Sequence, residues 1–259
     1  MILIVFFVVI ALLAPVIAPY DYKAQELASR LKPPSSAHWF GTDDLGRDLF
    51  TRVLYGARIS LWVGIFSVLG SVIIGTLLGI LAGFYGKWVD MVISRLFDIV
   101  LAFPSILLAI AIVAILGPSL QNALYAIAIV NIPTYGRLVR AKVLSLKNEE
   151  YITAARAVGM KNSAILFNHI LPNSLTPIIV QGTLGIATAI IEAAALGFLG
   201  LGASPPTAEW GKMLSDSRPF IATAPWTVIF PGISIMSTVL AFNLMGDGLS
   251  DALDPRMKS

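Results

Sequence analysis

Three carboxylates interrupt long apolar runs of this chain and are its strongest candidates for chemistry. Asp98, Glu192 and Asp247 each lie within or at the end of a stretch of mainly aliphatic residues. If these runs cross a membrane, a carboxylate inside one needs a partner or water, and such residues often mark a substrate or ion pathway. We therefore consider all three for a translocation path or its gate. The alternatives are an ion pair of Asp98 with Arg95, a packing hydrogen bond for Glu192 and a solvated helix end for Asp247.

No familiar catalytic constellation accompanies these carboxylates. The sequence contains no G-x-x-x-x-G-K-[ST] phosphate-binding loop, no nucleophile elbow and no H-E-x-x-H pair. Cysteine is absent, which excludes disulfides and thiolate metal sites. His38 and His169 are the only histidines, and the topology predicted below places them on opposite sides of the membrane. We expect no catalytic residue, no metal site and no cofactor bound by this chain.

The composition requires a membrane setting. Of 259 residues, 57% are hydrophobic and only 13% are charged, whereas soluble domains have about a quarter charged residues. The net charge of +3 is spread along the chain, and no basic stripe favours nucleic acid. These properties predict an all-α polytopic membrane protein that contacts lipid and no nucleic acid.

Six segments are long and apolar enough to be considered as membrane spans, which need about 20 residues. They cover residues 2–18, 61–84, 89–116, 120–139, 175–201 and 226–249. The first is short and starts at the initiator methionine without a cationic leader. A cleaved signal peptide is the alternative, but the apolar run is too long and lacks an A-x-A-like site. We expect a retained helix behind a trimmed or mis-started N-terminus.

Basic residues between positions 137 and 161 set the expected orientation. Only Glu149 and Glu150 oppose them there. The basic residues are Arg137, Arg140, Lys142, Lys147, Arg156 and Lys161. The positive-inside rule places this loop in the cytoplasm. Counting helices outward from it puts both termini in the cytoplasm and residues 19–60 and 202–225 outside.

The apolar runs divide the chain into three parts. Residues 1–18 are the expected first transmembrane helix, residues 19–60 an external interfacial segment, and residues 61–259 a core with five further spanning helices. In the external segment, Thr42 or Asp43 is expected to cap a helix that lies at the membrane interface.

Glycine and proline positions predict where helices pack or bend. Gly75, Gly79 and Gly83 recur every four residues, which allows another helix backbone to approach closely. Pro104 and Pro133 fall within apolar segments and should kink or interrupt their helices.

The polar segment 148–172 has a layout unusual for a connecting loop. It starts with acidic residues, continues with small ones and reaches Gly159. This glycine is expected to end a helix over 149–157 as its C′ residue, or to permit close approach of another backbone. Helical spacing gives this helix a face of small and apolar residues. The residues on that face are Tyr151, Ala154, Ala155 and Val158. Such a face, ending in glycine, is suited to a cleft in a partner protein.

A second short helix is expected to follow. Asn162 or Ser163 can cap it, and it should run to Leu171, where Pro172 forces a turn into the next span. Two short cytoplasmic helices at right angles would transmit a partner's motion to the spans on either side.

The residues of this segment resemble a motif of a known family. The sequence TAARAVG followed by HILP is similar to the EAA motif of ABC importer permeases, E-A-A-x-x-x-G with a distal I-x-L-P element. The matching residues are Ala154, Ala155, Gly159, Leu171 and Pro172. Thr153 stands where the motif has glutamate, and His169 where it has isoleucine. The resemblance implies that these residues, with Glu150, contact a partner ATPase.

Four further blocks resemble the second permease of dipeptide, oligopeptide and nickel importers. They occur in order and span nearly the whole chain, at residues 40–61, 98–110, 195–214 and 246–257. The resemblance implies an inner-membrane permease core that pairs with a homologous permease. It also implies two cytoplasmic ATPases, which bind ATP and Mg²⁺, and an external binding protein that delivers the substrate.

The resulting hypothesis is a permease subunit for import of dipeptides and oligopeptides. A nickel or metal-chelate importer of the same branch shares every motif and stays open as the alternative. An autonomous carrier or a membrane-embedded enzyme is a distant third possibility, since the chain lacks the nucleophile, metal cluster or buried proton chain that either would need.

Overall fold

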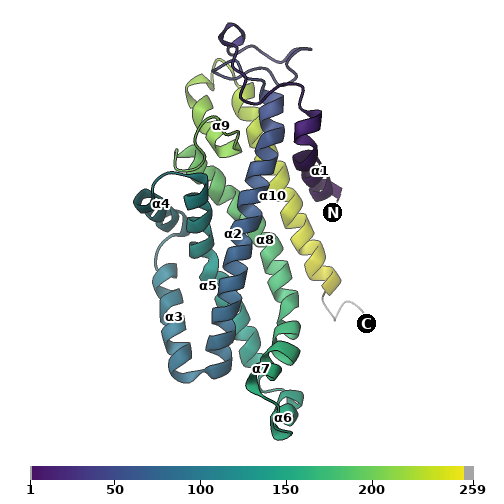
Figure 1. The fold of residues 1–259 in the computed structure, drawn as a ribbon, viewed down its shortest axis with the longest axis vertical. Coiled ribbons are helices and arrows are strands. Elements are labelled where there is room, and N and C mark those ends of the chain that lie inside the picture. Colours follow the sequence, from purple (N-terminus) through teal and green to yellow (C-terminus); the bar gives the residue numbers. More distant parts are fainter. Residues whose placement is uncertain (1, 254–259) are drawn as a thin grey trace.

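The computed structural model describes residues 2–253, and its regular elements are helices (Figure 1). The long ones are α1 (Ile2–Ile17), α2 (Leu49–Tyr85), α3 (Lys87–Leu101), α4 (Ser105–Leu116), α5 (Leu120–Leu146), α8 (Leu171–Phe198) and α10 (Trp226–Leu253). The short ones are η1 (Leu27–Ser29), α6 (Glu150–Ala157), α7 (Asn162–Ile165), η2 (Leu166–Ile170), α9 (Trp210–Ser217) and η3 (Arg218–Phe220). The all-α prediction is confirmed.

Apart from α4, which lies at 90° to α3, the long helices run roughly along the long axis of the molecule and separate its two ends (Figure 1). Helices α6 and α7 lie at one end of the bundle, and the segment before α2 lies with α9 at the other. The sequence therefore places its polar 148–172 segment and its external segment at opposite ends, as the predicted topology requires.

Helices coincide with the six predicted spans, but fewer pass a test of length and apolarity. Helix α2, the continuous helix Asn162–Phe198 and α10 are long and apolar enough to span a membrane, and the bent pair of α3 and α4 adds at most a fourth. Helix α1 has only 16 residues, and the second half of α5 carries Arg137, Arg140 and Lys142. The predicted count of six is therefore not reproduced by these criteria.

The predicted span over 89–116 is not one continuous helix, and the interruption lies at Pro104, as expected. The chain breaks there into α3 and α4, whose axes differ by 90°. Pro104 precedes the first residue of α4. Proline lacks a backbone N–H and disfavours helical backbone at the residue before it, which explains the break. Pro133, by contrast, is buried within an unbroken α5, so only one of the two prolines interrupts its helix.

The helix expected to start at Thr42 or Asp43 starts later. Helix α2 is capped by Asp48, whose carboxylate accepts a hydrogen bond from the Thr51 N–H at 2.8 Å. The helix then continues without a break through the predicted boundary between residues 60 and 61. Thr42 and Asp43 lie buried in the preceding loop, because their side chains bind other loop groups.

The core forms where α2 crosses α5. A β-carbon on Gly75, Gly79 or Gly83 would lie 2.7, 2.5 or 2.8 Å from the nearest atom of α5. The prediction that these glycines admit a neighbouring helix is thus confirmed. The Ser71 hydroxyl adds a polar link between the helices, donating to the Ala128 carbonyl at 2.8 Å. Interhelical hydrogen bonds of this kind stabilise membrane helix pairs modestly.

Candidate functional site

Helix α6 forms where the sequence predicts it and divides its residues between two environments. Ile152 is fully buried and Ala155 nearly so, in an apolar cluster with Val143 of α5. Thr153 and Ala154 are exposed. Of the two motif alanines, one therefore anchors α6 to the bundle and the other remains available to a partner.

Gly159 ends α6 in the predicted way. Its N–H donates to the Arg156 carbonyl and the Met160 N–H donates to the Ala155 carbonyl, both at 3.0 Å. These two bonds form a Schellman motif, which places a left-handed residue at C′. Gly159 has a φ of +82°, and a β-carbon on it would find no heavy atom within 4 Å. The backbone requires glycine there, while the space beside it is open.

The expected second helix begins at Asn162, but it is not separate from the next span, because no turn occurs at Pro172. Residues 162–198 form one continuous helix, α7 through α8, and neither Asn162 nor Ser163 caps it, because Lys161 occupies the N-cap position. A π-helical turn precedes Pro172, in which the Leu171 N–H bonds to the Leu166 carbonyl. The extra residue in that turn accommodates the proline ring, and the helix continues through it.

A contact between α6 and the π-turn joins the two halves of the motif. The rings of Tyr151 and His169 pack edge to face, with centroids 6.1 Å apart. The remaining motif positions line the same end of the molecule. Glu150, Thr153, Ala154, Gly159 and Pro172 are exposed, whereas His169 and Leu171 are half-buried. Tertiary structure thus brings these motif positions to one end of the molecule, where Ala155 is buried and the others are exposed or half-buried.

The carboxylates near α3 are paired with arginines. Asp98 lies 3.6 Å from Arg95, the predicted partner, and 2.6 Å from Arg137 of α5. The Arg140 guanidinium forms a bidentate ion pair with Asp90, with nitrogen-to-oxygen distances of 2.5 and 2.6 Å. The sequence did not predict Arg137 and Arg140 of α5 as the partners of Asp98 and Asp90, because nothing in the local sequence links positions so far apart.

Glu192 is buried in α8 and has a neutral partner. Its carboxylate accepts a hydrogen bond from the side-chain amide of Asn131 at 2.9 Å. Asp247 is exposed near the end of α10 and makes no ion pair with any residue of 2–253. Asp98, Glu192 and Asp247 therefore sit in three different environments and do not form one site.

A buried ionic cluster at the other end of the bundle was not predicted. The Arg47 guanidinium donates to the Asp43 carboxylate at 2.6 Å. Arg52 is 2% exposed and donates to the carbonyls of Tyr22 and Pro206, at 3.0 and 3.3 Å. This arginine ties two loops to the start of α2, which is a structural role.

Glu209 caps α9 nearby. Its two carboxylate oxygens accept the N–H groups of Gly211 and Lys212, each at 2.7 Å. Burial raises the pKa of Glu209 to about 7. The helix N-terminus acts in the opposite direction, because it favours the charged carboxylate.

The histidines take part in separate local contacts. His38 lies 2.9 Å from the carboxylate of Asp48 in the segment before α2, whereas His169 belongs to the π-turn after α7. The segment before α2 and α7 lie at opposite ends of the bundle (Figure 1). Among the residues that the structure describes, no three potential ligands gather around a metal position.

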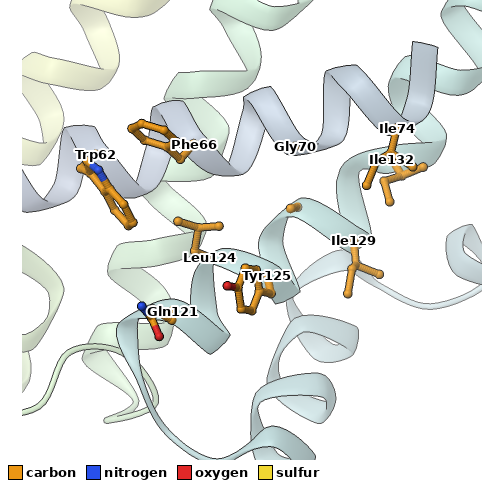
Figure 2. Close-up of a pocket in the computed structure, with 10 residues that line it drawn as sticks. Trp62, Phe66, Gly70, Ile74, Gln121, Leu124, Tyr125, Ile129 and Ile132 are labelled. Atoms are coloured by element: carbon orange, nitrogen blue, oxygen red, sulfur yellow. The ribbon is translucent and has the colours of Figure 1, made fainter. Parts of the chain in front are cut away.

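An open apolar groove of about 470 Å³ runs between α2 and α5. Figure 2 shows Trp62 and Phe66 of α2 facing Leu124 and Tyr125 of α5 across it. Gln121 is the one amide in its lining. The lining holds no acid or amine, so it is suited to apolar contacts and not to catalysis.

Two family descriptions match the chain. The first, binding-protein-dependent transport system inner membrane component, matches residues 75–259. The second, N-terminal transmembrane domain of oligopeptide transport permease C, matches residues 1–34.

Curated relatives align along almost the whole chain. The dipeptide transport system permease protein DppC of Alkalihalophilus pseudofirmus is 68% identical over 259 residues, covering all of this chain and 85% of the relative. The glutathione transport system permease protein GsiD of Pectobacterium atrosepticum is 53% identical over 253 residues, covering 97% and 84% of the two chains. A structure of the MetNI methionine ABC transporter in inward-facing conformations has a TM-score of 0.65 at 19% identity, covering 80% of this chain and 98% of that one. That likeness shows a shared fold.

Proposed function

Because the chain belongs to the family of binding-protein-dependent transport system inner membrane components, we propose that it carries dipeptides and short oligopeptides as the permease subunit of an ABC importer. Identity of 68% over its whole length to a dipeptide permease carries this proposal. The relatives are permeases, so the chain is a transport component and not an enzyme. Glutathione is itself a small peptide, and the second relative therefore supports the same substrate class.

The proposal includes partners that supply what this chain lacks. Its sequence has no phosphate-binding loop, so two cytoplasmic ATPases would bind ATP and Mg²⁺. A homologous permease would complete the translocation path within the lipid bilayer, and an external binding protein would deliver the peptide. In this arrangement both termini and α6 face the cytoplasm, in keeping with the basic residues that surround α6.

The coupling surface would be the exposed side of α6 with the π-turn. Ile152 and Ala155 fix α6 to the bundle, so a force on its exposed face reaches α5 and α8. Thr153 cannot supply the charge of the motif glutamate. Glu150 is exposed and precedes Thr153 and Ala154 by three and four positions, which places it on the same helix face. We assign the missing negative charge to Glu150.

Uptake by the reconstituted transporter tests the proposal. The chain, its sister permease, the ATPases and the binding protein are placed in proteoliposomes, and uptake of a labelled dipeptide is measured with and without ATP. We expect ATP-dependent uptake that unlabelled dipeptides and glutathione reduce by competition. Uptake that only a nickel chelate inhibits would replace the peptide assignment by the metal alternative. Flux through this chain alone, without ATPases, would replace it by an autonomous carrier.

A further inference from the structure

Glu192 differs from the other carboxylates on the helices α3 to α8 that cross the bundle. Asp90 and Asp98 have arginine partners, Arg140 and Arg137, at 2.5 and 2.6 Å. Glu192 is 8% exposed, yet no basic side chain within residues 2–253 lies within ion-pair distance of it. A buried carboxylate without a counter-ion is costly, and a protein that keeps one inside a membrane commonly uses it for function.

The neighbours of Glu192 orient its carboxylate without neutralising it. The Asn131 amide donates to it at 2.9 Å and also donates to the Ile127 carbonyl at 2.9 Å, so the amide is held from both sides. Donors of this kind favour the charged carboxylate but leave its charge to be matched by something else.

Glu192 lies close to the break between α3 and α4, since its neighbour Ala193 belongs to the apolar cluster against which Ile106 of α4 packs. Ser105 is the first residue of α4, directly after the bend of 90°. At that bend Phe103 is 56% exposed, so the elbow forms part of the surface of this subunit. In membrane transporters, helices broken near the middle of the bilayer frequently border the substrate, because their free ends offer polar groups at that depth. Glu192 is thus a carboxylate placed beside an accessible break.

We propose that the Glu192 carboxylate, oriented by Asn131, binds the N-terminal ammonium group of the peptide as it passes the elbow between α3 and α4. This inference rests on the proposed function. Every dipeptide with a free N-terminus carries a positively charged ammonium group, whatever its side chains. It is opposite in sign to the carboxylate and supplies the counter-ion that no described residue of the chain provides. A contact of this type is permissive for side chains and selective for a free N-terminus.

The test compares Glu192→Gln and Glu192→Asp in the complete reconstituted transporter. Glutamine has the same shape and keeps an acceptor for Asn131, whereas aspartate keeps the charge on a shorter side chain. We expect maximal dipeptide uptake to fall about 10-fold to 100-fold in Glu192→Gln, the range for a hydrogen bond to a charged group. Glu192→Asp should retain more uptake than Glu192→Gln. Subunit assembly and ATP hydrolysis without peptide should be unchanged in both.

Two outcomes overturn the inference while the proposed function stands. If Glu192→Gln imports like the wild type and Glu192→Asp is impaired, the Glu192 side chain only makes a hydrogen bond within the packed helices. That role depends on the shape of the side chain and not on its charge. If Glu192→Gln loses assembly or peptide-free ATP hydrolysis, the charge pairs with a partner subunit. A wild-type transporter that imports no dipeptide refutes the proposed function itself, and the ammonium contact with it.

Discussion

Replacing Gly159 with alanine tests whether coupling depends on the capped end of α6. Gly159 has a φ of +82°, and a β-carbon at this position would have no heavy atom within 4 Å, so alanine adds backbone strain and no clash within this chain. Gly200 is a matched control at the end of α8. It has a φ of +79°, equally open surroundings and the same pair of backbone hydrogen bonds, both at 2.9 Å.

The size of the effect follows from the backbone conformation. A left-handed backbone costs an L-residue about 1–2 kcal/mol, which corresponds to a factor of about 5–30 in an equilibrium. Helix α6 has 8 residues and is too short to be stable on its own. If the ATPase binds only the capped form, its apparent affinity should fall by about 5-fold to 30-fold in Gly159→Ala. The thermal midpoint should shift slightly and equally in both variants.

The assay measures the affinity of the ATPase for the permease pair in nanodiscs and the peptide imported per ATP hydrolysed. Gly159→Asn adds a further comparison, because asparagine tolerates the left-handed backbone better than alanine does. If the ATPase affinity recovers in Gly159→Asn, the loss of affinity in Gly159→Ala is due to the backbone conformation. If it does not recover, the loss is due to close approach of the ATPase to this position. Equal losses in Gly159→Ala and Gly200→Ala, or none in Gly159→Ala, would refute the reasoning.

Three further predictions concern packing, pH and charge. Gly79→Ala should lower the thermal midpoint, because its β-carbon would lie 2.5 Å from a backbone oxygen of α5, whereas Gly70→Ala, at 3.5 Å from a methyl group, should change it little. The pKa of Glu209 is raised from 4.5 to about 7, so its stabilising contribution is complete below pH 4.5 and is lost as the pH rises to 7. Wild-type stability relative to Glu209→Gln should therefore fall by roughly 3 kcal/mol over that interval in pH-dependent unfolding, and a flat difference would contradict it. Glu150→Gln should weaken ATPase binding at low salt and less at high salt, and an unchanged affinity would remove Glu150 from the coupling surface.

The parts of this protein that sequence alone predicts are those governed by neighbouring residues. Apolar runs locate the helices because burial in lipid depends on local composition. Gly159 predicts the end of α6 because the left-handed C′ position favours glycine wherever it occurs. The spacing of Gly75, Gly79 and Gly83 marks a helix contact because one face of a helix is a local property.

Tertiary structure alone decides which distant groups meet. The pairs Asp98 with Arg137 and Glu192 with Asn131 join residues 39 and 61 positions apart, and no periodicity in the sequence connects them. Local rules also failed at Pro172, where a π-turn carries the helix through a proline that by itself predicts a turn. The physical reason is the same in each case. Packing of the surrounding helices sets the free energy of these contacts, so the local preferences of the residues involved do not determine the outcome.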